Sequence, residues 1–201
     1  MNGERQMVWK NLILYLAVQS FTLGPNNLTC IYLGGKGGLK ATRKFLTGSM
    51  ASLFVKALIC GTLNIVMAKT MPAVVNVLKW FGAAYMLYLA WIMASSGWKD
   101  EASMTGQQTE STYRSGIILQ LLNAKSWIAA ISVFAVYVIP HTTSFAVIFA
   151  VSAIFLIIAL AFSLVWVFFG AALSRFMNRY KKLFGIIMGL SLVYCAITAL
   201  I

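Results

Sequence analysis

The sequence has few acidic residues and almost no histidine. It contains four Asp and Glu residues together, one His, three Cys and three Pro among 201 residues. The four acids are Glu4, Asp100, Glu101 and Glu110, and all of them lie outside the long apolar segments. A carboxylate that could act as a nucleophile, a metal ligand or an intramembrane proton relay is therefore missing from these segments. The sequence predicts no metal site and no cofactor, because one His and scattered Cys form no ligand cluster.

The three cysteines also exclude several activities. Cys30, Cys60 and Cys195 lie in or beside apolar runs and form no CxxC pair, so they are interpreted as small buried hydrophobic residues. A membrane-embedded redox protein or enzyme is the alternative class, and it would need a CxxC, a metal cluster, or a paired nucleophile and base. We expect a protein that is not an enzyme. A triple Cys→Ser variant that keeps its activity would agree with this.

Apolar residues are what the sequence has in abundance. Hydrophobic residues make up 61% and charged residues 10%, and the mean hydropathy is +0.85, which is typical of an integral membrane protein. The formal charge is +12, but the basic residues cluster at the ends of apolar segments and form no long basic tail. The lipid bilayer, with its anionic headgroups, is therefore the expected partner, and nucleic acid is not.

The apolar residues fall into six segments of a length suited to crossing a bilayer. A window of about 19 residues places them at 7–33, 45–68, 73–94, 116–139, 145–172 and 184–201. Their continuous apolar character favours helices over the alternating strands of an outer-membrane barrel. We predict an all-α membrane protein with six transmembrane helices in one transporter domain, 1–201. The polar breaks between the segments are 34–44, 69–72, 95–114, 140–144 and 174–182.

The longest break, 95–114, divides the chain into two sets of three segments. We expect a first three-helix repeat at 1–94, a cytoplasmic loop at 95–114 and a second three-helix repeat at 115–201. An odd number of spans in each repeat inverts the second relative to the first. Lys and Arg concentrate in the first and fifth breaks, at Lys36, Lys40, Arg43, Lys44, Arg175, Arg179, Lys181 and Lys182. Since cytoplasmic loops carry this excess, both termini are predicted to be periplasmic.

The first apolar segment contains a polar interruption, "LGPNN". Pro25 lacks the N–H that a helix interior needs, Gly24 lets the chain turn, and Asn26 and Asn27 offer partners for the freed backbone groups. We expect two half-helices with an irregular joint. The joint lies about 12 Å from the cytoplasmic end of the segment at 1.5 Å per residue, near the middle of a core of about 30 Å.

A second polar group lies in the fourth segment, in "LQLLNAKSW". Gln120, Asn123 and Lys125 enter from the opposite side and reach a similar depth, so the two groups are predicted to meet. The N-terminus of a half-helix, amides and an ammonium suit a small carboxylate. A substrate ammonium would need carbonyls, amides or a hydroxyl such as that of Tyr85.

Four of these sequence features also have an explanation in which they serve the structure and not a binding site. Pro25 could be a simple kink, with the asparagines bonding between helices. Lys125 could extend to the cytoplasmic interface. We expect Lys56 to lie at a shallow depth with a structural role. The GxxxG match at Gly185 and Gly189 could pack within the bundle or in a homodimer.

Four stretches resemble the LysE/RhtB family of amino-acid exporters. They are "GPNN" at 24–27, "GAAYMLYLAW" at 82–91, "LQLLNAKSW" at 119–127 and "LVYCA" at 192–196, and they follow one another in the family's order. The resemblance implies a multi-pass protein of the bacterial inner membrane with six spans and inverted repeats. It also implies efflux of small neutral amino acids such as cysteine and O-acetylserine by alternating access, with the proton as the coupling ion. Export of homoserine, threonine or leucine is the alternative.

The resemblance also assigns residues. The broken-helix motif of the family matches Gly24, Pro25 and Asn26, and its Asn-Pro-Lys-like motif matches Asn123 and Lys125. Ala124 stands where many relatives have proline, so we expect a milder break in the fourth segment than in the first.

Overall fold

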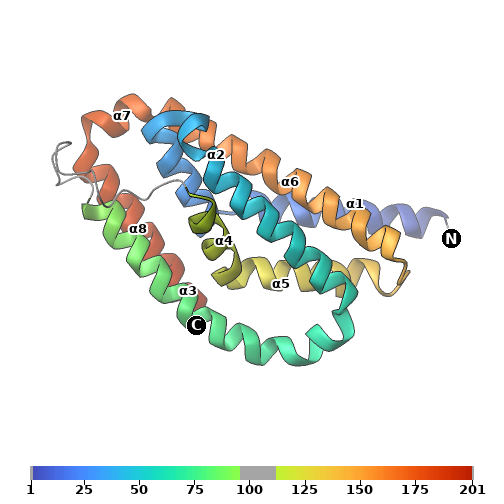
Figure 1. The fold of residues 1–201 in the computed structure, drawn as a ribbon. Helices are drawn as coiled ribbons and strands as arrows, with labels where there is room; N and C mark the ends of the chain where they lie inside the picture. Colours follow the sequence, from blue (N-terminus) through green and yellow to red (C-terminus); the bar gives the residue numbers. More distant parts are fainter. Residues whose placement is uncertain (1, 96–111, 201) are drawn as a thin grey trace.

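The structure is a computed structural model that describes residues 2–95 and 112–200. This part of the chain contains helices and no strands (Figure 1). In chain order they are α1 (Asn2–Phe21), α2 (Pro25–Thr62), α3 (Asn64–Ser95), α4 (Tyr113–Leu122), α5 (Ala124–Ser132), the π-helix η2 (Val133–Val138), α6 (Phe145–Ala172), α7 (Ser174–Arg179) and α8 (Lys181–Leu200). The all-α prediction is confirmed.

The first apolar segment is broken at the predicted joint. Helix α1 ends at Phe21, and α2 begins at Pro25 after an extended Gly24 (φ −161°, ψ 179°). Proline suits this first helical position because the N–H it lacks would have no partner within the helix. Helix α2 then reverses at Gly37 and Gly38, where Gly38 has a φ of 59° that glycine adopts without strain.

The fourth segment breaks more sharply than expected. Helices α4 and α5 meet at Asn123 (φ −78°, ψ 95°), and the two parts are bent by 65°. The expectation of a mild break, based on Ala124 in place of proline, is therefore wrong. Proline is not needed here because the extended ψ of Asn123 takes this residue out of the helix, and side chains supply the missing hydrogen bonds.

The boundary between the second and third segments was placed too late. Helix α2 ends at Thr62, Leu63 leaves the helical conformation (φ −105°, ψ 23°), and α3 runs without interruption from Asn64 to Ser95 through the predicted break at 69–72. A proline inside a helix removes one hydrogen bond and bends the helix without always ending it. Figure 1 shows α3 curving through its first half. The predicted loop at 95–114 lies almost wholly outside the described residues.

Two helices in the described part of the chain, α2 and α6, are each long and apolar enough to cross a membrane. The bent run from α4 through η2 meets the same criteria as a third span when it is taken as one unit. Six spans and two inverted repeats stay predictions. Helix α6, with 28 residues, is about 42 Å long at 1.5 Å per residue, which exceeds a bilayer core of about 30 Å.

Glycines allow α2 to lie directly against its neighbours. A Cβ built on Gly34 would lie 2.3 Å from the carbonyl oxygen of Val167 in α6, and one on Gly170 would lie 2.1 Å from that of Ile31 in α2. Gly116 of α4 faces the backbone of α2 in the same way, at 2.2 Å from the Phe45 carbonyl oxygen. Such backbone approach is the packing expected of small residues between membrane helices.

The GxxxG match also packs within the chain. Gly185 and Gly189 of α8 face the carbonyl oxygens of Met93 and Ala90 in α3. Figure 1 shows these two helices side by side. The structure therefore assigns this motif to the interior of the bundle.

The ends of the helices alternate between two ends of the molecule (Figure 1). The turn at Gly37–Gly38, the end of α3 at Ser95, and α7 lie at one end. The start of α1, the turn at Leu63, and the 139–144 connection lie at the other. Exposed basic side chains gather at the first end, at Lys36, Lys40, Arg43, Lys44, Arg175, Arg179 and Lys182.

Candidate functional site: a cavity between two broken helices

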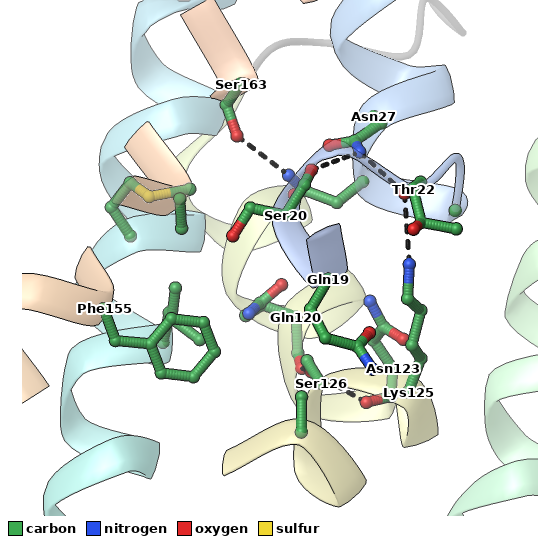
Figure 2. A pocket seen from close by; sticks show the side chains of 16 residues that line it. Gln19, Ser20, Thr22, Asn27, Gln120, Asn123, Lys125, Ser126, Phe155 and Ser163 are labelled. Atoms are coloured by element: carbon green, nitrogen blue, oxygen red, sulfur yellow. Dashed lines mark hydrogen bonds between the residues drawn. The ribbon is translucent and has the colours of Figure 1, made fainter. Parts of the chain in front are cut away.

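A cavity of about 70 Å³ lies where the two broken helices meet (Figure 2). This is several times the roughly 10–15 Å³ that one water molecule requires. The cavity is lined by Gln19, Ser20, Thr22, Gly24, Asn26, Asn27, Met50, Leu53, Gln120, Asn123, Lys125, Ser126, Ala129, Phe155, Ala159 and Ser163. These residues come from α1, α2, α4, α5 and α6 and from the two breaks.

The cavity lies at the middle of the bundle. Ala159 is at the midpoint of α6 (Phe145–Ala172), and it lines the cavity together with Ser163 one turn later. Two apolar clusters flank this level. Leu16 and Phe155 belong to one cluster, whereas Leu28 and Val167 belong to the other. The polar lining is thus placed between two apolar clusters.

Side chains satisfy the carbonyl groups that the first break sets free. Asn27 donates from Nδ2 to the carbonyl oxygens of Ser20 (2.9 Å) and Thr22 (3.0 Å). Lys125 of α5 donates from Nζ to the same Thr22 oxygen at 3.1 Å, as Figure 2 shows. The C-terminal end of α1 therefore faces an amide from its own half of the chain and an ammonium from the other half.

Side chains also donate to the carbonyl groups around the second break. Lys56 of α2 donates from Nζ to the Gln120 carbonyl oxygen at 2.7 Å and also to the Ser126 hydroxyl. The Ser126 hydroxyl donates to the Asn123 carbonyl oxygen at 2.8 Å. Trp127 Nε1 donates to the Leu121 carbonyl oxygen at 2.7 Å. Lys56, Ser126 and Trp127 thus donate to carbonyl groups around the second break that lack a helical N–H partner.

Asn26 joins three segments around the cavity. Its Nδ2 donates to the Ser163 hydroxyl of α6 at 3.4 Å, and its Oδ1 accepts from the Ser49 hydroxyl at 2.7 Å. Asn26 and Asn27 therefore have the interhelical bonding role considered as an alternative, and both also line the cavity. The two interpretations apply together at these positions.

The structure brings six of the eight predicted site residues to this cavity. They are Gly24, Asn26, Asn27, Gln120, Asn123 and Lys125. Pro25 does not line it but begins α2 beside it. Tyr85 is not among the lining residues: it packs against the apolar cluster that contains Leu28 and Val167, with its ring 6.0 Å from that of Tyr88.

Lys56 lies deeper in the bundle than the sequence predicts. We expected a shallow position, but its side chain is 1% exposed and bonds to the second break. The sequence does carry a signal for this, because a lysine inside an apolar helix needs buried acceptors. Ser163 and Gln19 were also missed. A lone serine or glutamine in an apolar helix more often bonds within its own helix or faces lipid headgroups.

The lining has the chemistry of a site for a small zwitterion. Two half-helices, α2 and α5, begin at the cavity, and the N–H groups of a first helical turn have no partners within their helix. With the Lys125 ammonium and the Asn123 and Gln120 amides, they can bind a carboxylate. The wall opposite is apolar, with Leu53 and Phe155. The described residues hold no group of three metal-ligating side chains.

Comparison with known proteins identifies the class to which this fold and site belong. The family of LysE type translocators matches residues 17–201. The chain belongs to this family, as the resemblance noted above predicts. No solved structure gave a significant match.

Several relatives have a more specific name. A cysteine/O-acetylserine efflux protein of Escherichia coli O1:K1 is 28% identical over 184 residues, which cover 91% of this chain and 92% of the relative. The proteins of the same name from Escherichia coli K12 and Shigella sonnei are each 27% identical over 183 residues, with the same coverage.

Proposed function

We propose that this protein exports small neutral amino acids of the cysteine and O-acetylserine type across the bacterial inner membrane. It does so as a secondary transporter that exposes the cavity to each side in turn. The observation that carries the proposal is the cavity itself, where Asn26 from one broken helix and Asn123 from the other lie in one polar lining at the middle of the bundle. Family membership and the names of the relatives support amino-acid efflux.

The binding mode follows from the arrangement of donors and acceptors. The substrate carboxylate is bound by Lys125 and the first turns of α2 and α5, as in transporters whose half-helix N-termini face the anionic group of the substrate. The substrate ammonium is bound by hydroxyl and amide oxygens such as those of Ser126 and Gln120. The small volume, with Phe155 and Leu53 as the wall, selects short side chains.

Alternating access fits the layers that flank the cavity. The apolar cluster with Leu16 closes one side, and the cluster with Leu28 closes the other. Opening one layer at a time would expose the cavity to one compartment. We assign the end of the molecule that carries Lys40 and Arg175 to the cytoplasm because of its exposed basic residues. We propose on this basis that both termini lie in the periplasm.

The decisive experiment measures export from cells that overproduce the protein. The medium is assayed for cysteine, O-acetylserine, homoserine, threonine and leucine, with the Asn26→Ala/Asn123→Ala double variant as the matched comparison. We expect accumulation of cysteine and O-acetylserine with the wild type and at least a tenfold lower rate with the double variant. Efflux that the double variant leaves unchanged would remove the site assignment.

Two controls make the result specific. The amount of inserted protein is compared by immunoblot of membranes, because Asn26 also bonds to Ser49 and Ser163. Lys44→Met alters an exposed residue of α2 outside the cavity and should export at the wild-type rate. Preferential efflux of homoserine, threonine or leucine would keep the transporter and replace its substrate.

A further inference from the structure

Lys56 is a charged group that the proposed binding mode does not use. Among the described side chains it is the one lysine, arginine or acid that is buried, at 1% exposure. It lies between Leu53 and Ala57, which belong to the apolar cluster on one side of the cavity. A buried ammonium persists only where buried acceptors bind it. Packing alone therefore does not account for a lysine at position 56.

Among the side chains that the structure describes, those around Lys56 include acceptors but no carboxylate. Its ammonium bonds to the Gln120 carbonyl oxygen and the Ser126 hydroxyl and lies 5.1 Å from the centre of the Trp127 ring. The nearest titratable group along α2 is the buried Cys60 thiol, one turn away. Lys125 is directed to Thr22 at the other break.

Ser126 connects Lys56 to the cavity. Its hydroxyl accepts from Lys56, donates to the Asn123 carbonyl oxygen, and lines the cavity. The Ser126 oxygen is one of the acceptors in the lining that a substrate ammonium could reach. An ammonium at position 56 and an ammonium in the cavity therefore compete for the same hydroxyl, and their like charges repel.

We propose that Lys56 carries the coupling proton and that the bound amino acid and this proton exclude each other through Ser126; this rests on the proposed function. The protonated Lys56 holds Ser126 and Gln120. When Lys56 releases one proton through Ser126 to water in the cavity, its amine loses the charge that repels a substrate ammonium and gains a lone pair. The Ser126 hydroxyl can then donate to this lone pair, and its oxygen is left to accept a hydrogen bond from the substrate ammonium. The substrate then binds. Reprotonation from the opposite side reverses these steps and expels the substrate, which is antiport.

Competition of this kind has a measurable signature. Proton and substrate affinities are linked reciprocally, so one competing proton weakens substrate binding by at most about tenfold for each pH unit of acidification. The binding of radiolabelled L-cysteine to purified protein is measured between pH 5.5 and 7.5 under reducing conditions. Over this range the thiol of free cysteine stays protonated. We expect the wild-type Kd to fall as the pH rises.

Variants at position 56 should lose this pH dependence. Lys56→Met should bind L-cysteine with a Kd that is constant over the range. Lys56→Arg keeps its charge at every pH and should bind weakly throughout. In liposomes both variants should lose accumulation driven by a pH gradient. Lys44→Met is the control for the loss of a lysine from α2 and should behave as the wild type does.

The outcomes separate the two proposals. A wild-type Kd that does not change with pH, or wild-type pH dependence in either position-56 variant, overturns the role of Lys56 and leaves the exporter intact. Should Lys56→Met fail to fold, the wild-type and Lys56→Arg measurements still decide. A wild-type protein that neither binds nor exports any amino acid in the panel overturns the proposed function.

Discussion

Lys125 and Lys56 each donate a hydrogen bond to a carbonyl oxygen that a break in another helix sets free. In other transporters with broken helices, such carbonyl groups coordinate the coupling cation. Here the cation is a side chain of the protein, supplied to each break by the opposite half of the chain. An unpaired backbone carbonyl in the bilayer core costs several kcal/mol, so these side chains are part of what makes the breaks stable.

At the residue scale, Asn27 gives a direct test of this bonding. Asn27→Asp removes both Nδ2 donors and places an acceptor against the carbonyl oxygens of Ser20 and Thr22. The Thr22 oxygen keeps its bond from Lys125, so we expect a loss of stability of about 1–3 kcal/mol from the unpaired Ser20 carbonyl group, seen as a lower thermal unfolding midpoint in detergent. Asn27→Ala should lose less, because it introduces no opposing acceptor. Equal midpoints for Asn27→Asp and the wild type would contradict this role.

At the scale of the elements, α2 is the centre of the bundle. It packs against α6 at Gly34 and Gly170 and against α4 at Gly48 and Gly116. These contacts bring backbones together on both sides of one helix. The positions of the two breaks relative to each other therefore depend on small residues that do not themselves line the cavity.

Gly170→Ala should disrupt this packing. Its Cβ would lie 2.1 Å from the Ile31 carbonyl oxygen, and backbone atoms cannot move away as a flexible side chain can. We expect poor insertion, or a loss of stability of at least about 1–3 kcal/mol, which is typical of overpacking. The yield of monodisperse protein and its unfolding midpoint measure these effects. Gly24→Ala is the matched control, since its Cβ would meet only the Lys125 side chain at 3.8 Å. Equal yields for the two variants would refute the packing argument.

Much of this arrangement was predictable at the level of elements. The break at Gly24–Pro25 was predictable because a proline without an N–H and two amides leave few alternatives in an apolar segment. The sharp bend at Asn123 was not, because it depends on hydrogen bonds to Lys56, Ser126 and Trp127 that only the folded bundle brings together. The end of α2 at Thr62 is marked by neither a proline nor a charged residue, so the sequence predicts the boundary later, at the break 69–72, which has both.

The site was predictable in its polar core and not in its walls. Six of the residues at the cavity were predicted correctly because the sequence places both polar groups at the same depth. Met50, Phe155 and Ala159 are ordinary apolar residues in ordinary helices, and their place in the lining follows from packing alone. Tyr85 was included for its hydroxyl, a property that says nothing about which face of α3 turns to the cavity.

At the scale of the whole molecule, the helix ends alternate between a basic end and an opposite end (Figure 1). A fusion of alkaline phosphatase to the C-terminus should be active, since the enzyme folds only outside the cytoplasm and the basic end is retained inside. A fusion after Lys182, on the basic end, should be inactive and should fluoresce when green fluorescent protein replaces the phosphatase. The reverse pattern would invert the assigned orientation and the direction of transport.

The pairing of donors and breaks also bears on how the chain enters the membrane during synthesis. Asn27 lies close to Ser20 and Thr22 in the chain, so the first break can be closed locally before Lys125 has been translated. Lys56 is already in place when the Gln120 carbonyl group arrives. Each of the two breaks thus has a donor available early in synthesis, since Asn27 follows the first break within a few residues and Lys56 precedes the second.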